Sequence, residues 1–253
     1  MNGKLARVIA RLDIKAPNLI KGIHLEGLRV LGEPKKFAFD YYTQGVDEIL
    51  YMDSVASLYQ RNSLHSLLRD SVEEIFIPFT VGGGIRSLDD AKAILKLGAD
   101  KVALNTAVVK NVTLLKDISA VTGAQAIVLS VECKKQTNGW EVYTDCGRER
   151  TGLDVVDWVR NAQQHGIGEV LLTSVDREGT RSGYDLDLLN TVSESVTLPI
   201  IASGGFGGLN DAVDALNVKN VTAIAIADAL HYKRFSVGQI KRHLLEHGFQ
   251  VRL

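Results

Sequence analysis

Two glycine clusters constrain the fold of this chain more than any other feature of the sequence. The first is TVGGGI at residues 80–85 and the second is ASGGF at residues 202–206. Each follows a short apolar segment and precedes a helix-like one, so each is predicted to join a strand to a helix. Glycine lets backbone N–H groups approach a phosphate, and a helix N-terminus favours an anion. The repetition indicates a duplicated half-unit, with glycines that only turn tight corners as the alternative.

Strand-like and helix-like segments alternate along the chain. The predicted strands lie at residues 5–14, 48–53, 75–79, 101–104, 126–132, 169–174, 199–203 and 223–227. The predicted helices lie at residues 37–44, 63–72, 88–97, 112–121, 154–165, 185–192, 209–216 and 237–247. Ser63 is the expected N-cap of the second helix, and hairpins are expected within residues 16–34 and around residues 140–143.

This alternation predicts the fold class. Eight strands and eight helices in 253 residues favour a closed (β/α)8 TIM barrel over an open doubly wound sheet. The short, apolar strands suit buried parallel pairing. We therefore expect a single domain, residues 1–253, built from two duplicated half-barrels.

Composition excludes several classes of protein. The formal net charge of −1 argues against a nucleic-acid-binding surface, and no apolar run reaches the roughly 20 residues of a membrane span. Cys133 and Cys146 are too few for a disulfide framework, and no His/Cys/carboxylate pattern indicates a metal site. We expect a cytoplasmic protein that uses no metal or cofactor and binds neither nucleic acid nor a membrane.

Two carboxylates end predicted strands at matching positions of the two halves. Asp13 ends the first strand and Glu132 the fifth. Catalytic groups of such barrels lie at the C-terminal rim, and a twofold relation would make these acids face each other there. One could take a proton while the other gives one, if their environments differ. The alternative is that each accepts hydrogen bonds from rim backbone amides.

The duplicated glycine clusters predict two phosphate sites at the same rim. The first would use Gly83, Gly84, Asn105 and Thr106. The second would use Gly179, Gly204, Gly205, Ala227 and Asp228, and the strand-end residues Thr173 and Ser203 complete the predicted substrate-binding set. A ligand with phosphates at both ends would lie across the mouth. The carboxylate of Asp228 would repel a phosphate unless it points away or is paired.

Four charged residues lie near strand starts, at the opposite end of the predicted barrel. They are Arg7, Glu48, Lys101 and Glu169. Their alternating signs allow a ring around the N-terminal opening. The alternative is a set of surface salt bridges, each of which contributes little to stability.

Together, these residues resemble the cyclase subunit of imidazole glycerol phosphate synthase, from histidine biosynthesis. The resemblance covers nearly the whole chain. It rests on RLDIK at 11–15, KG at 21–22, PFTVGGGI at 78–85, GADKV at 98–102, EVLLTSVDR at 169–177, GT at 179–180, SGYD at 182–185 and LPIIASGG at 198–205.

The resemblance implies a lyase of the cyclase type that forms a heterodimer with a glutaminase subunit at its N-terminal face. Ammonia from the glutaminase would cross the barrel and attack a bis-phosphorylated ribulosyl aminoimidazole carboxamide nucleotide. The products would be imidazole glycerol phosphate and aminoimidazole carboxamide ribotide. The resemblance further implies that Asp13 is a catalytic acid/base and that Lys21, on the first loop, helps close the site. The four charged residues would form the ammonia gate.

Four departures from the family pattern lie at the mouth. Glu132 replaces an aspartate catalyst, Arg11 replaces the usual cysteine, Asp228 replaces a small hydroxyl residue, and Glu178 replaces an aspartate. A retained ammonia path with an altered mouth also fits a paralogue that passes ammonia to a sugar amidotransferase in surface-polysaccharide biosynthesis. A related isomerase barrel and a different bis-phosphate substrate remain further alternatives.

Overall fold

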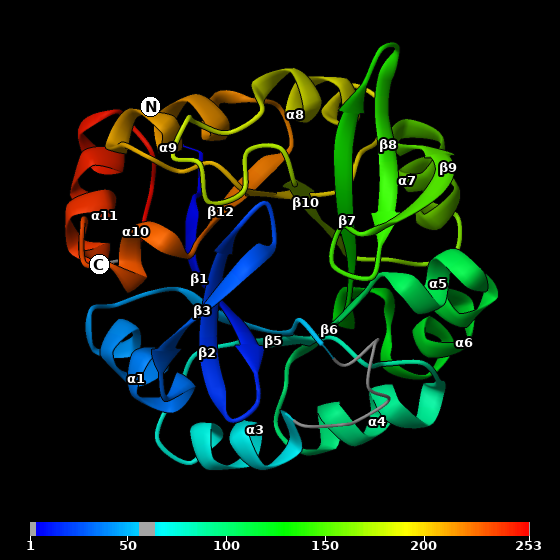
Figure 1. Cartoon of the computed structure of the whole chain (residues 1–253), viewed down its shortest axis with the longest axis horizontal. Helices are drawn as coiled ribbons and strands as arrows, with labels where there is room; N and C mark the ends of the chain where they lie inside the picture. The colour runs from blue at the N-terminus through cyan, green and yellow to red at the C-terminus, as the bar shows by residue number, and fades with distance from the viewer. Residues whose placement is uncertain (1–3, 56–63, 253) are drawn as a thin grey trace.

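A closed barrel of parallel strands forms the centre of the molecule (Figure 1). The computed structural model describes residues 4–55 and 64–252. Within these ranges the barrel strands are β1 (Arg7–Lys15), β4 (Glu48–Asp53), β5 (Phe79–Gly82), β6 (Lys101–Leu104), β7 (Ile127–Gln136), β10 (Glu169–Ser174), β11 (Ile200–Ser203) and β12 (Val221–Ile226). Strand β10 pairs with β7 as well as with β11, which closes the sheet. The predicted (β/α)8 barrel is confirmed.

Helices surround the barrel (Figure 1). They are α1 (Pro34–Thr43), α3 (Leu64–Val72), α4 (Leu88–Lys96), α5 (Thr106–Lys110), α6 (Thr113–Thr122), α7 (Val155–Gln163), α8 (Leu186–Ser193), α9 (Leu209–Asn217), α10 (Asp228–His231) and α11 (Val237–Glu246), with a 3-10 turn η1 (Ala124–Ala126). Capping side chains fix several starts: the Ser87 hydroxyl accepts from the N–H of Asp90 at α4. In the part of the chain that the structure describes, no helix is long and apolar enough to cross a bilayer.

The duplication expected from the glycine clusters is visible element by element. Strand β1 is followed by the antiparallel pair β2 (Asn18–Ile23) and β3 (Glu26–Gly32), and β7 by β8 (Gly139–Thr144) and β9 (Glu149–Asp154). Strands β5 and β11 lead into the glycine clusters, and β6 and β12 lead into the short helices α5 and α10. Both halves thus carry the same elements in the same order.

The glycines of the two clusters are required by the backbone itself. Gly83 and Gly205 have φ angles of +95° and +112°, which L side chains rarely adopt. A Cβ on Gly83 would lie 2.4 Å from the Asp53 carbonyl oxygen, and one on Gly205 would lie 2.1 Å from that of Gly183. The tight backbone turn alone therefore requires glycine at these two positions, whether or not an anion also binds there.

The barrel interior is layered along its axis. Alternate residues of each strand point inward, and an apolar cluster fills the middle, made of Ile9, Leu50, Met52, Ala103, Val128, Leu171, Ile201, Ala223 and Ala225. A larger apolar cluster lies between the strands and the helices. The apolar layer separates a polar N-terminal end from a polar C-terminal end.

The third strand is placed differently from our expectation. It is β5, Phe79–Gly82, rather than residues 75–79, so the expected apolar run mostly precedes the strand. Ile75 and Ile77 are buried in the apolar cluster between the strands and the helices. The residues of this segment that face the barrel interior are Thr80 and Gly82, on β5. The short helices α5 and α10 were also not predicted. Ser63, the expected N-cap, lies outside the described residues.

Lys241 holds α11 against the segment that precedes β4 and should be important for stability. Its buried Nζ donates to the carbonyl oxygens of Gly45 (2.7 Å) and Arg252 (2.6 Å) and to Asp47 Oδ1 (2.6 Å). Lys241→Met leaves the charge of Asp47 without this partner, so we expect a loss of about 3 kcal/mol in the free energy of unfolding, measured by urea denaturation. The exposed neighbour Arg242→Met is the control, expected within about 0.5 kcal/mol of wild type. Equal stability of the two variants would contradict the prediction.

Candidate active site

The four predicted gate residues form one connected ring at the N-terminal end of the barrel. Arg7 Nη1 lies 3.1 Å from Glu48 Oε2, and Arg7 also pairs with Glu169. Lys101 Nζ lies 3.2 Å from Glu48 Oε2 and 3.0 Å from Glu169 Oε2. The side chains are largely buried, from 3% exposed for Glu48 to 27% for Arg7. The alternative interpretation, a set of separate surface salt bridges, is therefore wrong.

At the opposite end, Asp13 lies among positive charges. Arg11 Nε donates to Asp13 Oδ1 at 2.9 Å, and Lys21 Nζ lies 3.7 Å from Asp13 Oδ2 while also pairing with Glu178. Burial alone would raise the pKa of Asp13, but the charges of Arg11 and Lys21 outweigh burial and hold that pKa below its ordinary value. Asp13 is therefore ionised at neutral pH.

Glu132 occupies a different environment on β7. Among the described residues its carboxylate accepts hydrogen bonds only at Oε2, from the N–H of Gly147 (2.9 Å) and Asn105 Nδ2 (3.3 Å). Burial raises the pKa of Glu132 to about 7, although the Arg11 charge and the Gly147 hydrogen bond act against it. Near neutral pH this residue can thus hold a proton that Asp13 has lost, the condition for opposite acid and base roles.

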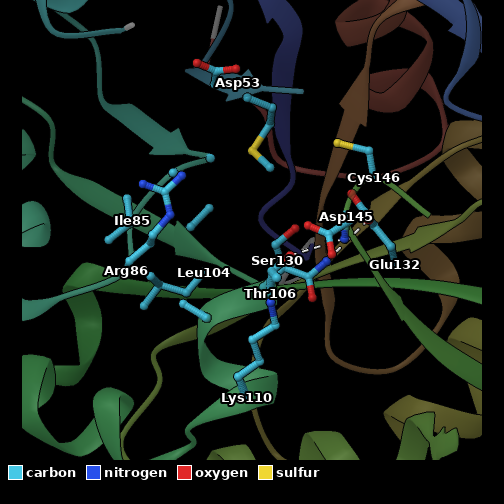
Figure 2. A pocket seen from close by; sticks show the side chains of 16 residues that line it. Asp53, Ile85, Arg86, Leu104, Thr106, Lys110, Ser130, Glu132, Asp145 and Cys146 are labelled. Atoms are coloured by element: carbon cyan, nitrogen blue, oxygen red, sulfur yellow. Dashed lines mark hydrogen bonds between the residues drawn. The ribbon is translucent and has the colours of Figure 1, made fainter. Parts of the chain in front are cut away.

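A cavity of about 320 Å³ opens beside Glu132 (Figure 2). It is lined by the complete first predicted phosphate site, Gly83, Gly84, Asn105 and Thr106. Arg86 and Lys110 also line it, and Figure 2 shows both on the side away from Glu132. Cationic side chains beside exposed glycine N–H groups suit a phosphate.

The second predicted phosphate site is nearly closed. Its members Gly179, Gly204, Gly205, Ala227 and Asp228 line a cavity of only about 20 Å³, together with Ser203 and Arg11. Asp228 meets one of the two conditions under which no repulsion was expected, because it is paired: its Oδ1 accepts from Arg181 Nε (3.0 Å) and Arg234 Nη1 (2.5 Å). The carboxylate is paired, yet little free volume remains beside it.

Arg11 was missed as a site residue. Its Nη1 donates to Thr173 Oγ1 (3.1 Å) and Ser203 Oγ (3.0 Å), so two of the predicted substrate-binding hydroxyls contact this guanidinium. The available signal was the arginine at a position where the family usually has cysteine. Lys110 gave no such signal, since it lies on α5, a helix that the sequence did not reveal.

The β2–β3 hairpin lies against the loop that follows β10. The N–H of His24 donates to the Glu178 carbonyl oxygen at 2.8 Å, and His24 Nδ1 lies 2.9 Å from the Val175 carbonyl oxygen. Gly179 is needed here, because a Cβ on it would lie 2.7 Å from the Gly22 carbonyl oxygen. The hairpin thereby brings Lys21 to Asp13. Over residues 4–55 and 64–252, no group of three or more His, Cys, Asp or Glu side chains is placed to hold a metal ion.

These observations define a class of protein: a (β/α)8 barrel with duplicated halves, a charged ring at one end, and two carboxylates with glycine-rich turns at the other. The sequence profile described as "Histidine biosynthesis protein" matches residues 7–236. The chain therefore belongs to the family of histidine biosynthesis proteins.

Three similar proteins carry the same name, "Imidazole glycerol phosphate synthase subunit HisF". The one from Legionella pneumophila is 61% identical over 206 residues, which are 81% of this chain and 97% of that protein. Those from Streptococcus mutans and Alkaliphilus metalliredigens are 41% and 42% identical over 247 residues, 97% of this chain and 98% of each relative. The likeness thus extends over both halves of the barrel.

The raised pKa of Glu132 makes stability depend on pH. Its ordinary pKa is 4.5 and its folded value is about 7, so between these values the folded protein holds a proton that the unfolded chain has released. Stability therefore falls as the pH rises through this window, by roughly 3 kcal/mol. Glu132→Gln cannot titrate and should lack this loss. The measurement is urea denaturation of both proteins at pH 5 and pH 8; parallel pH dependence would contradict the assignment.

Proposed function

We propose that this chain is the cyclase subunit of an imidazole glycerol phosphate synthase. The observation that carries the proposal is the pair of carboxylates at one rim, an ionised Asp13 and a protonatable Glu132, the second of which lines a cavity together with Gly83 and Gly84. The names of the similar proteins support the same activity. We further propose that residues 1–253 act as one domain in the cytoplasm.

The substrate would be a bis-phosphorylated ribulosyl aminoimidazole carboxamide nucleotide. One phosphate would bind at Gly83 and Gly84 with Thr106, and the other at the second glycine cluster. Asp13 would take a proton from the attacking ammonia, and Glu132 would give one to the oxygen that leaves, so that no net proton is gained. Lys21 would hold the hairpin over the bound substrate. The products would be imidazole glycerol phosphate and aminoimidazole carboxamide ribotide.

Ammonia would come from a glutaminase subunit bound at the N-terminal face. The ring of Arg7, Glu48, Lys101 and Glu169 spans that end of the barrel, and small side chains such as Ala103 and Ala223 lie in the apolar layer above it. Uncharged ammonia crosses an apolar layer far more easily than ammonium. The charged ring would then move aside to admit it.

Purified protein tests the cyclase directly. With the nucleotide substrate and an ammonium salt, the wild type should form both products without a glutaminase. Asp13→Asn and Glu132→Gln should each lower kcat by about 100- to 10,000-fold, since each removes one proton-transfer group. The two products are measured by chromatography. The variant Glu132→Asp tests whether the longer glutamate side chain affects turnover. No turnover by the wild type or by Glu132→Asp would contradict the cyclase.

A second candidate is a barrel that passes ammonia to a sugar amidotransferase in surface-polysaccharide biosynthesis. The observation that favours it is the second phosphate site, where only about 20 Å³ remains beside Asp228 and Arg11. A conduit would need the charged ring but neither phosphate site. It would bind a glutaminase, stimulate glutamine hydrolysis and leave the nucleotide unchanged.

Both candidates require the ring to couple two reactions. Lys101→Met removes a cation that contacts both Glu48 and Glu169, so the ring should no longer close. With a glutaminase partner, glutamine hydrolysis should exceed the amount of aminated product by several-fold, whereas wild type should keep the two equal. Glutamate and product are measured together. The exposed Lys92→Met is the matched control, and unchanged coupling in Lys101→Met would remove the gate from the proposal.

A further inference from the structure

Arg11 places a buried positive charge directly beside Asp13. The residue is 3% exposed, and its guanidinium donates to Asp13 on β1, Thr173 on β10 and Ser203 on β11. These three contacts of 2.9, 3.1 and 3.0 Å involve three barrel strands, so the planar group has one well-defined position. A guanidinium is charged at every pH at which the protein is folded.

The four charges of the ion-pair cluster around Asp13 balance one another without Glu132. Arg11 and Lys21 are positive, and their ion-pair partners Asp13 and Glu178 are negative. Glu132 receives hydrogen bonds only from uncharged donors among the described residues. An ionised Glu132 would therefore add a negative charge, with no charged hydrogen-bond donor of its own, to a buried site, which is unfavourable.

We propose that Arg11 is a positioning residue that sets the base role of Asp13: its guanidinium keeps Asp13 ionised, while Glu132, buried beside uncharged donors, is left as the protonated acid. In one turnover Asp13 gains a proton and Glu132 loses one from Oε1, the oxygen that carries no hydrogen bond within the described chain. The catalytic part of this inference rests on the proposed cyclase function. The resting protonation states do not, and they can be measured on their own.

Other titratable groups lie near Asp13 or line the cavity beside Glu132. Near Asp13 they are Lys21 on β2, Glu178 after β10, His231 on α10, and Asp145, Cys146 and Arg148 in the turn between β8 and β9; Asp53, Arg86 and Lys110 line the cavity. Burial lowers the pKa of His231 to about 3, and burial raises the pKa of Cys146, so both are uncharged at neutral pH. Asp145 and Arg148 have opposite charges.

A purely structural role for Arg11 would be to tie β1 to β10 and β11 by hydrogen bonds. The two roles differ in what a neutral donor can replace. Arg11→Gln keeps an amide that can donate but removes the charge, while Arg11→Lys keeps the charge and loses the planar geometry. Arg11→Met removes both. Circular dichroism and thermal melting identify the variants that are folded.

Infrared spectroscopy across a pH titration tests the proposal on the full chain without substrate. The C=O stretch of protonated carboxylic acids is assigned by its loss in Glu132→Gln and in Asp13→Asn. Near pH 6 the wild type should show the Glu132 band and no Asp13 band. An Asp13 band at this pH, or a missing Glu132 band, would overturn the proposal without any Arg11 variant.

The Arg11 variants then test the cause. In Arg11→Gln, and in Arg11→Met if it folds, the Asp13 midpoint should rise by about 1–3 pH units, and Arg11→Lys should restore most of the wild-type value. In the pH profile of kcat, measured with ammonium salts at a constant concentration of free ammonia, the midpoint on the acid side should rise in the same variants. An unchanged Asp13 midpoint in folded Arg11→Gln would overturn the role of Arg11. Absence of turnover in wild type contradicts only the proposed function, because the infrared titration still reports on Arg11.

Discussion

The pairing of β10 with β7 is the interaction on which the rest of the structure depends. Because it closes the sheet, the inward side chains of the barrel strands pack mainly on one another, and the interior opens only at the two ends. Charged groups inside must therefore find partners across the barrel. The ring of Arg7, Glu48, Lys101 and Glu169 and the mouth cluster around Arg11 are two solutions of this one requirement, separated by an apolar layer.

Much of this arrangement could be predicted from the sequence. Strand ends are where parallel strands expose polar side chains, so Asp13 and Glu132 could be placed at one rim without coordinates. The third strand was misplaced because a buried run before a strand, such as Ile75 and Ile77, has the same apolar character as the strand itself. Lys110 was missed because α5 is too short to show a period. No one-dimensional pattern could show that Arg11 reaches across to Thr173 and Ser203.

The two halves have kept one backbone plan while their side chains have diverged. Gly83 and Gly205 keep left-handed φ angles that only the turn geometry explains. An open cavity lies beside the first glycine cluster, whereas Arg11 and the ion pairs of Asp228 lie beside the second. Divergence of this kind changes what a duplicated site can hold without changing the fold.

The contact between the β2–β3 hairpin and the loop after β10 has a consequence for the order of events in a catalytic cycle. Lys21 reaches Asp13 and Glu178 in a structure in which His24 is bonded to that loop. A hairpin that swings outward to admit a ligand carries a cation away and leaves two buried anions with Arg11 alone. The return of the hairpin over the ligand then also returns the missing positive charge. An open mouth without ligand would therefore be chemically idle.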